Sequence, residues 1–197
     1  MREPEQTATE AGGESSQPKI IATPGGSLLP DFRSWIRDLV VSLFIAGVII
    51  VFLYQPVKVE GTSMMPWLTD QERIFINKFV YQFEAIHRGD VVVFRYPLDP
   101  AKSYIKRVIG LPGETVRMVD GEVFINGRKL LEPYIVREYR DHQSHEPMAV
   151  PLDEFYVLGD RRNSSNDSRV WGTVARKYVY GKAVFVYWPM DRFGFLP

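Results

Sequence analysis

Three polar segments of the sequence contain residue types that can carry out nucleophilic chemistry. The first, GTSMMP, contains Ser63, and the second, YIKRVIGLPGE, contains Lys106. The third, GDRRNSSNDSR, contains Ser165. A serine hydroxyl becomes an effective nucleophile when a neighbouring base removes its proton, and a neutral lysine is such a base. Taken singly, the three segments are also explained as a Gly-Ser turn, an edge strand with a solvated Lys-Arg pair and a polar loop. Together they would supply the groups for serine–lysine chemistry if the fold brings them into contact.

The segment around Lys106 has the pattern of a strand that buries this lysine. Side chains alternate between the two faces of a strand, so Tyr104, Lys106 and Val108 share one face and Arg107 takes the other. Lys106 then lies between an aromatic and a branched aliphatic side chain. Burial disfavours the ammonium form and lowers the pKa of a lysine from about 10.4 towards the working pH. The alternative is a solvated lysine on an open strand.

The composition offers few of the residues that other catalytic or metal-binding sites require. The chain has no cysteine and three histidines, so it has no disulfide framework, thiol nucleophile or cysteine-ligated metal. His142 and His145 form an H-x-x-H pair, but a metal site needs further ligands, and a surface loop is the simpler interpretation. We therefore expect no cofactor and no metal.

The chain has 24 Lys and Arg residues and 24 Asp and Glu residues, and this balance of charge argues against a nucleic-acid partner.

The elements that would position these segments are mainly β-strands. Runs of β-branched and aromatic residues alternate with turn signals such as Asp120-Gly121 and Asn126-Gly127, which favour tight hairpins. A short helical turn is expected in stretches such as 176–181. The pattern predicts a mainly β catalytic domain over residues 57–197, with an antiparallel sheet or barrel. The predicted strands cover residues 91–97, 104–111, 115–119, 122–127, 154–160 and 182–189.

A long apolar segment precedes this domain. Residues 39–57 carry no charge, and their length is close to the roughly 20 residues that cross a bilayer. The segment is apolar on every face, and Trp35 and Tyr54 bracket it as interfacial aromatic residues do. We predict a transmembrane anchor helix over residues 35–56, with a buried core helix as the alternative. A cleavable signal peptide fits less well, because the run begins late and no A-x-A pattern follows it.

The charges beside this segment favour one orientation in the membrane. Arg33 and Arg37 precede it and Lys58 follows it, which predicts a cytoplasmic N-terminus and a catalytic domain on the outer or periplasmic face. The lipid bilayer is therefore an expected partner. Residues 1–34 are predicted to be a mobile N-terminal tail, because the first 30 are rich in Glu, Ser, Gly and Pro.

In type and order, the three polar segments resemble the motifs of bacterial-type signal peptidase I, the membrane-bound leader peptidase family. The motifs are G-x-S-M-x-P, Y-I-K-R-V-x-G-x-P-G and G-D-x-R-x-x-S-x-D-S-R, and the resemblance covers about residues 35–190. It implies that Ser63 is the nucleophile and Lys106 the general base, and that the Ser165 hydroxyl orients the lysine. It also implies an oxyanion hole formed by the Ser63 backbone N–H and a donor at Gly61, where part of the family has a serine.

The resemblance implies roles for further residues around the dyad. Arg161 occupies a position where the family usually has Asn, and we expect this departure to be tolerated. Alternating acidic and basic residues of the third segment are expected to form an ion-pair network that holds the Ser165 loop: Asp160, Arg162, Asp167 and Arg169. Shallow apolar pockets that accept small residues are expected to be lined by Val57, Val59, Met64, Leu68, Tyr104 and Ile105.

The activity that the resemblance implies is removal of N-terminal signal peptides from exported preproteins. Cleavage would follow small residues of the Ala-x-Ala type and pass through an acyl-enzyme. The expected location is the plasma or inner membrane, and a thylakoid membrane is an alternative. A self-cleaving repressor-type Ser/Lys protease is a rival interpretation, which the anchor disfavours. A non-catalytic single-span protein with a β ectodomain is another. Cleavage of a preprotein in trans would separate the three.

Overall fold

The computed structural model describes the backbone of residues 28–197 and the side chains of residues 32–48 and 55–197. Most of the tail predicted over residues 1–34 therefore lies outside the described residues. The chain divides into two units, Met1–Leu43 and Phe44–Pro197.

The helices are α1 (Leu28–Leu53), α2 (Val80–Phe83) and α3 (Ser168–Trp171), with 3-10 turns η1 (Arg137–Tyr139), η2 (Arg162–Ser164), η3 (Arg176–Tyr178) and η4 (Met190–Arg192). The strands are β1 (Tyr54–Lys58), β2 (Arg73–Asn77), β3 (Val91–Tyr96), β4 (Asp99–Gly110), β5 (Thr115–Val119), β6 (Glu122–Ile125), β7 (Arg128–Lys129), β8 (His145–Ala149), β9 (Glu154–Leu158), β10 (Val174–Ala175), β11 (Val179–Trp188) and β12 (Gly194–Phe195).

Helix α1 ends before the carboxyl end of the predicted anchor. The ring of Pro56 disfavours a helical backbone at Gln55, so the chain changes to the extended strand β1. Proline is tolerated there because β1 lies at the edge of its sheet. Within the described residues, no helical segment is long and apolar enough to span a membrane. The anchor predicted over 35–56 includes residues 49–54, whose side chains lie outside the described residues, and it stays a prediction.

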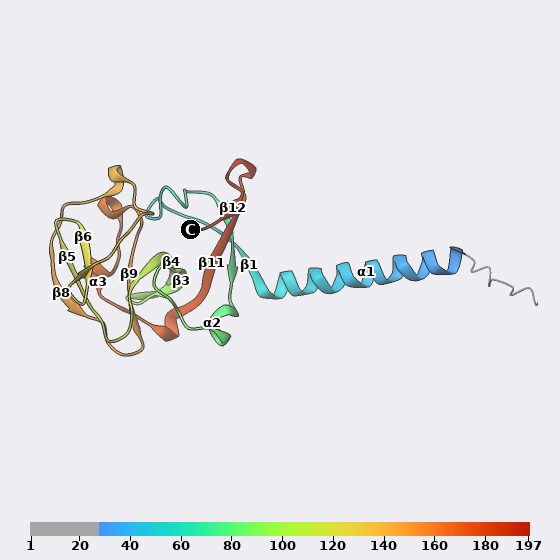
Figure 1. Cartoon of the computed structure of the whole chain (residues 1–197), viewed down its shortest axis with the longest axis horizontal. Coiled ribbons are helices and arrows are strands. Elements are labelled where there is room, and N and C mark those ends of the chain that lie inside the picture. The colour runs from blue at the N-terminus through green and yellow to red at the C-terminus, as the bar shows by residue number, and fades with distance from the viewer. Residues whose placement is uncertain (1–27) are drawn as a thin grey trace, which may run out of the picture. The chain divides into compact units, whose positions relative to one another are not determined.

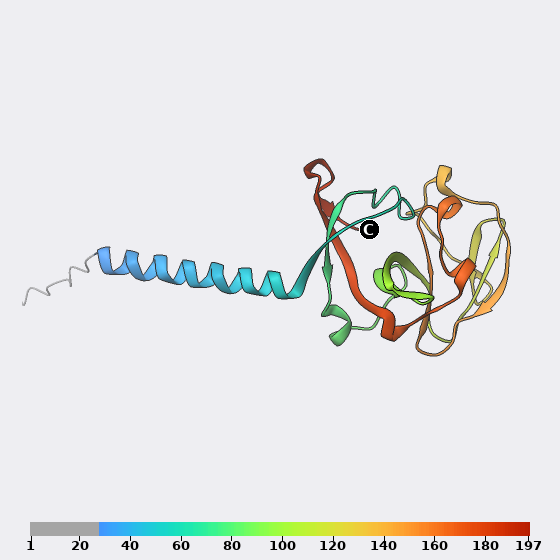
Figure 2. The same cartoon turned by 180° about the vertical axis from the view of Figure 1, so that it is seen from behind.

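The β domain contains two antiparallel sheets. The larger has the order β1-β2-β11-β3-β4-β9-β10, with β12 paired to β11, and the smaller has the order β7-β6-β5-β8. Both views show β5, β6 and β8 at one end of the domain and β1, β2 and β11 at the other (Figures 1 and 2). The mainly antiparallel β fold predicted from the sequence is confirmed.

The predicted runs correspond to strands of the structure. Residues 115–119 form β5, and the other predicted runs overlap β3, β4, β6, β9 and β11. The Asp120-Gly121 and Asn126-Gly127 turns have φ angles of 48°, 76°, 49° and 80°, which join β5 to β6 and β6 to β7 as tight hairpins. Turn η3 lies within the predicted helical stretch 176–181. The strands outside the predicted runs are β1, β2, β7, β8, β10 and β12.

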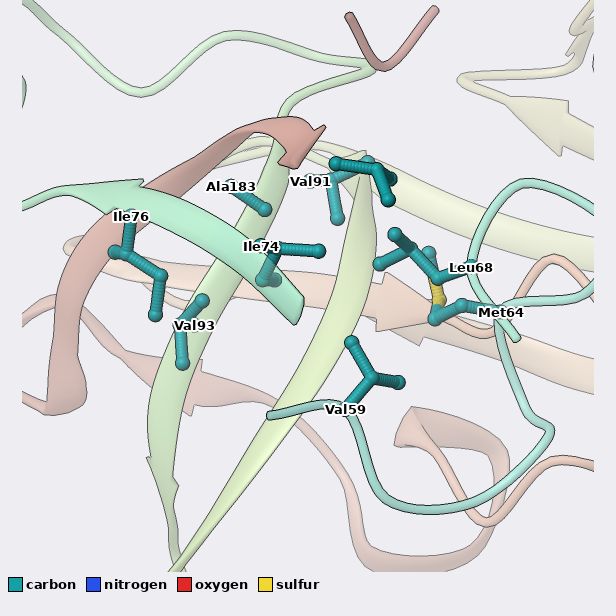
Figure 3. Close-up of a cluster of buried hydrophobic side chains, with 9 residues drawn as sticks. Val59, Met64, Leu68, Ile74, Ile76, Val91, Val93 and Ala183 are labelled. Carbon is teal, nitrogen blue, oxygen red and sulfur yellow. The ribbon is translucent and has the colours of Figure 1, made fainter. Parts of the chain in front are cut away.

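One core cluster fixes the loop that carries Ser63. Met64 and Leu68 come from this loop, residues 59–72, and lie beside Ile74 of β2 and Val91 of β3 (Figure 3). Leu68 is fully buried and Met64 is 3% exposed. Because the side chain after Ser63 is packed in the core, the loop holds Ser63 at a defined place at the edge of that core. A second cluster includes residues of β3, β4 and β9, and a third brings residues of β5 and β6 together with residues of β4 and β9.

Candidate active site

Ser63 and Lys106 lie in hydrogen-bond contact although 43 residues separate them in the sequence. Lys106 Nζ is 2.6 Å from Ser63 Oγ. The amine also donates to the backbone oxygen of Ile105 at 3.1 Å and lies 5.4 Å from the centroid of the Tyr104 ring. Lys106 forms no ion pair with a described residue. A lysine held in this way can accept the serine proton directly.

Burial lowers the pKa of Lys106. The side chain is only 4% exposed, and loss of hydration disfavours the ammonium form and brings the pKa down to about 8. The carboxylates of Asp167 and Asp160 act in the opposite direction, and Arg169 adds to the lowering. Desolvation is the largest of these effects, and with a pKa of about 8 the amine is mostly protonated at neutral pH and becomes mostly neutral in mildly alkaline solution.

The 59–72 loop is closed by backbone hydrogen bonds that hold Ser63 in place. Val59 donates to Glu72 and Gln71 donates back to Val59, and these bonds join the two ends of the loop. The Ser63 carbonyl accepts a bond of 3.0 Å from the Arg161 N–H. The loop is therefore tied both to itself and to the third polar segment.

Arg192 of η4 binds the same loop from the carboxyl end of the domain. Its Nε donates to Glu72 Oε1 at 2.9 Å, and its Nη2 donates to the Pro66 carbonyl at 2.6 Å. Glu72 is 2% exposed, and its other oxygen accepts from the Thr69 N–H. We call these contacts of Arg192 with Glu72 and Pro66 the Arg192 clamp. Pro66 and Arg192 are 126 residues apart in sequence, so the clamp depends on the complete tertiary fold.

Gly61 occupies a left-handed backbone conformation, and its N–H is already engaged. Its φ angle is +95°, a region that favours glycine. Its N–H donates to Asp70 Oδ1 at 2.8 Å, and this bond lowers the pKa of the Asp70 carboxyl. The predicted second oxyanion donor at Gly61 therefore has a carboxylate acceptor in this structure. A substrate oxyanion would have to replace Asp70 at this N–H.

Ser165 and Gly159 lie close behind the dyad. The Ser165 hydroxyl is buried, and in the described part of the chain Lys106 Nζ donates to Ile105 and contacts Ser63 rather than Ser165. A Cβ atom added at Gly159 would lie 2.1 Å from Ser165 Oγ and 2.6 Å from the Ser63 carbonyl oxygen. Only glycine allows these two segments to approach so closely.

The four charged residues predicted to form a network all make ion pairs, and three of their partners come from elsewhere. Asp160 binds Arg107 of β4, and Arg162 binds Glu132. Arg169 binds Asp167 within the segment, through two bonds of 2.8 Å, and also Asp141. Asp167 is fully buried, and Arg169 holds the pKa of its carboxyl below the usual range against desolvation. Arg107, which strand alternation assigns to the face opposite Lys106, is 1% exposed.

A cavity of about 300 Å³ adjoins the dyad. Ser63 and Lys106 both line it, and so do five of the six predicted pocket residues, Val57, Val59, Met64, Tyr104 and Ile105. The sixth, Leu68, is in the core. Further lining residues that the sequence analysis missed are Lys58, Glu60, Val93, Ser103, Asn166 and Tyr180. Ser103 shares a strand face with Ile105, and Val93 pairs with Ile105 across β3 and β4, so alternation was a usable signal for these two.

The histidine pair takes no part in this site. His142 lies in an exposed ion pair with Asp120, at 3.0 Å. Among the described residues, no group of three or more His, Asp or Glu side chains is arranged to hold a metal ion. The chemistry that the arrangement supports is proton transfer between a serine hydroxyl and a buried amine, next to an apolar cavity.

The chain is similar to known peptidases over most of its length. Residues 32–188 match the family model for signal peptidase, peptidase S26. The sequence is 41% identical over 167 residues to signal peptidase I of Leptolyngbya laminosa, with 81% of each chain covered. It is 36% identical over 169 residues to signal peptidase I T of Bacillus subtilis (strain 168), covering 81% of this chain and 87% of that one. A solved signal peptidase I from Enterococcus faecalis V583 is 32% identical, with a TM-score of 0.45, and covers 50% of this chain and 97% of that chain.

Proposed function

The chain belongs to the signal peptidase family, peptidase S26, and from this we propose that it removes N-terminal signal peptides from exported preproteins by a Ser63–Lys106 dyad. The observation that carries the proposal is the 2.6 Å contact between Lys106 Nζ and Ser63 Oγ. The lowered pKa of Lys106, about 8, supports its role as the base.

Acylation begins when Ser63 Oγ attacks the carbonyl carbon of the bond to be cut. The hydroxyl proton passes to neutral Lys106 Nζ, and the tetrahedral intermediate forms. The Lys106 ammonium then gives this proton to the leaving amine, the C–N bond breaks, and the signal peptide remains as an ester on Ser63. Lys106 next takes a proton from a water molecule, which attacks the ester. The lysine then gives this proton to Ser63 Oγ as the ester C–O bond breaks and the signal peptide leaves. The steps balance without a metal or an organic cofactor.

The oxyanion of each tetrahedral intermediate needs hydrogen-bond donors that are in place before the reaction. The Ser63 backbone N–H is one such donor. Gly61 supplies the second in this proposal, with its N–H passing from Asp70 to the substrate oxygen. Exposure of both Gly61 and Asp70 supports this exchange, because an exposed carboxylate is readily solvated when it loses the bond.

The cavity beside the dyad supports a preference for small residues before the cut, of the Ala-x-Ala type. Its apolar lining comes from Val57, Val59, Met64, Tyr104 and Ile105. In this proposal, the part of the cavity next to Ser63 accepts a methyl group and excludes larger side chains. We place the residues of the substrate that precede the scissile bond in this cavity.

Attachment to a membrane belongs to the same proposal. The uncharged run of residues 39–57 is the proposed anchor, with Arg33 and Arg37 on the cytoplasmic side and the catalytic domain on the outer face of the plasma membrane. A thylakoid membrane would present the same chemistry. Exposed apolar side chains near the carboxyl end of the β domain support contact with lipid: Trp188, Met190, Phe193 and Phe195.

A cleavage assay in detergent tests the proposal. Purified full-length protein is incubated with a preprotein that carries an Ala-x-Ala site, and the new N-terminus of the product is sequenced. Ser63→Ala should abolish cleavage, whereas Ser164→Ala, which removes an exposed hydroxyl from the third polar segment, should retain it. Full activity of Ser63→Ala, or inactivity of the wild type on every preprotein, would refute the proposal.

A further inference from the structure

Arg161 is the residue at which the third motif departs from the family pattern, and it lies beside the nucleophile. Its backbone N–H donates to the Ser63 carbonyl at 3.0 Å. Its guanidinium extends towards Met65 and Tyr139, with Nη1 3.8 Å from Met65 Sδ and Cζ 5.3 Å from the centroid of the Tyr139 ring. A thioether and an aromatic face therefore flank the guanidinium of a residue whose backbone is bonded to Ser63.

The charge of Arg161 is not neutralised within the described part of the protein. The arginines on either side of Ser165, Arg162 and Arg169, bind carboxylates, and Arg107 binds Asp160. Arg161 forms no ion pair with a described residue, and its Nε is buried without a hydrogen-bond partner there. A guanidinium presents five N–H donors in a planar fork that fits a carboxylate. Most of these donors remain available to an acceptor from outside the chain.

The placement of Arg161 relative to the cavity indicates which part of a substrate it meets. The cavity proposed to hold the residues before the cut is lined by Met64 and Ser63, and not by Met65, Tyr139 or Arg161. An extended peptide passes from that cavity across Ser63, so the residues that follow the cut lie beyond the nucleophile. Arg161 lies outside the cavity lining, and its guanidinium contacts Met65, two residues after Ser63 in the chain.

We propose that Arg161 is a specificity-determining residue that binds an acidic side chain at the first or second position after the cut. The inference rests on the proposed function and adds a preference on the leaving side of the scissile bond. The guanidinium is partly exposed, so the preference for Glu over Gln should be modest, about fivefold in kcat/KM. It should weaken with added salt, because exposed charges are screened.

The experiment uses full-length protein in a nonionic detergent, which keeps anionic lipid headgroups out of the assay. The substrates are preproteins that differ only in having Glu, Gln or Lys at the first or second position after the cut. The wild type should prefer Glu, and Arg161→Gln should bring the Glu-to-Gln ratio close to one. Arg161→Lys should keep part of the preference. Arg128→Gln removes the same charge from an exposed site on β7 and should keep all of it.

The outcomes separate this inference from the proposal on which it rests. Efficient wild-type cleavage with equal rates for Glu and Gln overturns the role of Arg161 and leaves the Ser63–Lys106 proposal standing. A preference that persists in Arg161→Gln, or disappears equally in Arg128→Gln, also overturns it. Absence of cleavage of all three substrates by the wild type refutes the proposed function, and this inference with it.

Discussion

The carboxylate of Asp160 holds the guanidinium of Arg107 through two hydrogen bonds, of 2.9 and 2.7 Å, and both side chains are buried. Arg107 follows Lys106 on β4, and Asp160 precedes Arg161, whose N–H binds the Ser63 carbonyl. The ion pair therefore joins the strand that carries the amine to the segment that holds the serine loop. The Arg107–Asp160 ion pair thus helps to hold Lys106 Nζ and Ser63 Oγ, the two groups that exchange a proton, at a fixed distance from each other.

Asp160→Asn tests this link. The variant leaves the Arg107 charge buried and unpaired, so the free energy of unfolding should fall by about 3–5 kcal/mol in urea denaturation. Because the Asp160 carboxylate raises the pKa of Lys106, the midpoint of the pH–rate profile should also move to lower pH. Asp99→Asn, at an exposed ion pair on the same strand, is the control and should change stability by less than about 1 kcal/mol. Equal stability of the two variants would contradict the prediction.

The pH dependence of cleavage reports the state of Lys106. Its pKa is lowered to about 8, so the rate with a fixed substrate should be low in acid and rise with pH through a midpoint near that value. Lys106→Arg should be nearly inactive, because a guanidinium cannot release a proton in this range. His142→Ala and His145→Ala should change little. Loss of activity in a histidine variant, together with turnover by Lys106→Arg, would refute the dyad.

Gly159→Ala introduces a Cβ atom that has no space. It would lie 2.1 Å from Ser165 Oγ and 2.6 Å from the Ser63 carbonyl oxygen, so the serine loop must shift. Because misplacement of about 1 Å can cost about 100-fold in rate, we expect a loss of that order in kcat. Ser165→Ala alone should be milder, since it affects only the orientation of the amine. The double variant should recover part of the Gly159→Ala loss, and no recovery would show that the Ser63 contact dominates.

The size of the cavity predicts selectivity at the position before the cut. Replacing Ala there with Leu or Phe should lower kcat/KM by at least about 100-fold, because the larger side chain displaces the scissile carbonyl from Ser63. Steady-state kinetics on matched preproteins measure the effect. Substitution at the second position before the cut is the control. Similar rates for Ala and Phe would exclude this cavity as the binding site.

The proposed anchor predicts the behaviour of truncated protein. Deleting residues 1–53 leaves β1 intact and should give a folded peptidase that is slower on membrane-bound preproteins and still stimulated by detergent or lipid. Deleting residues 1–56 removes three of the five β1 residues that pair with β2, and should lower the unfolding temperature as well. Circular dichroism and cleavage rates measure both. Loss of folding in the shorter deletion would mean that α1 is part of the core.

Local signals in the sequence predicted the hairpins and six of the twelve described strands, because turn pairs such as Asp120-Gly121 require a backbone conformation that few residues adopt. Residues 54–56, the first three of β1, were assigned to the anchor helix, since an apolar run alone does not distinguish helix from strand. Side chains whose environment depends on distant partners were harder to place. Arg107 is buried because Asp160, 53 residues away, neutralises it. Leu68 belongs to the core, and apolar character does not separate a core position from a pocket wall.

Because the protein is synthesised from its N-terminus, the Arg192 clamp can form only late in synthesis. Ser63 is among the earlier residues of the β domain to be synthesised, whereas the guanidinium that fixes Glu72 and Pro66 arrives 126 residues after Pro66. A nascent chain that has exposed its serine still lacks the contact that closes the loop around it. The full set of contacts around Ser63 therefore forms only after Arg192 has been synthesised, and a chain that stops before Arg192 should hold its serine loop less firmly.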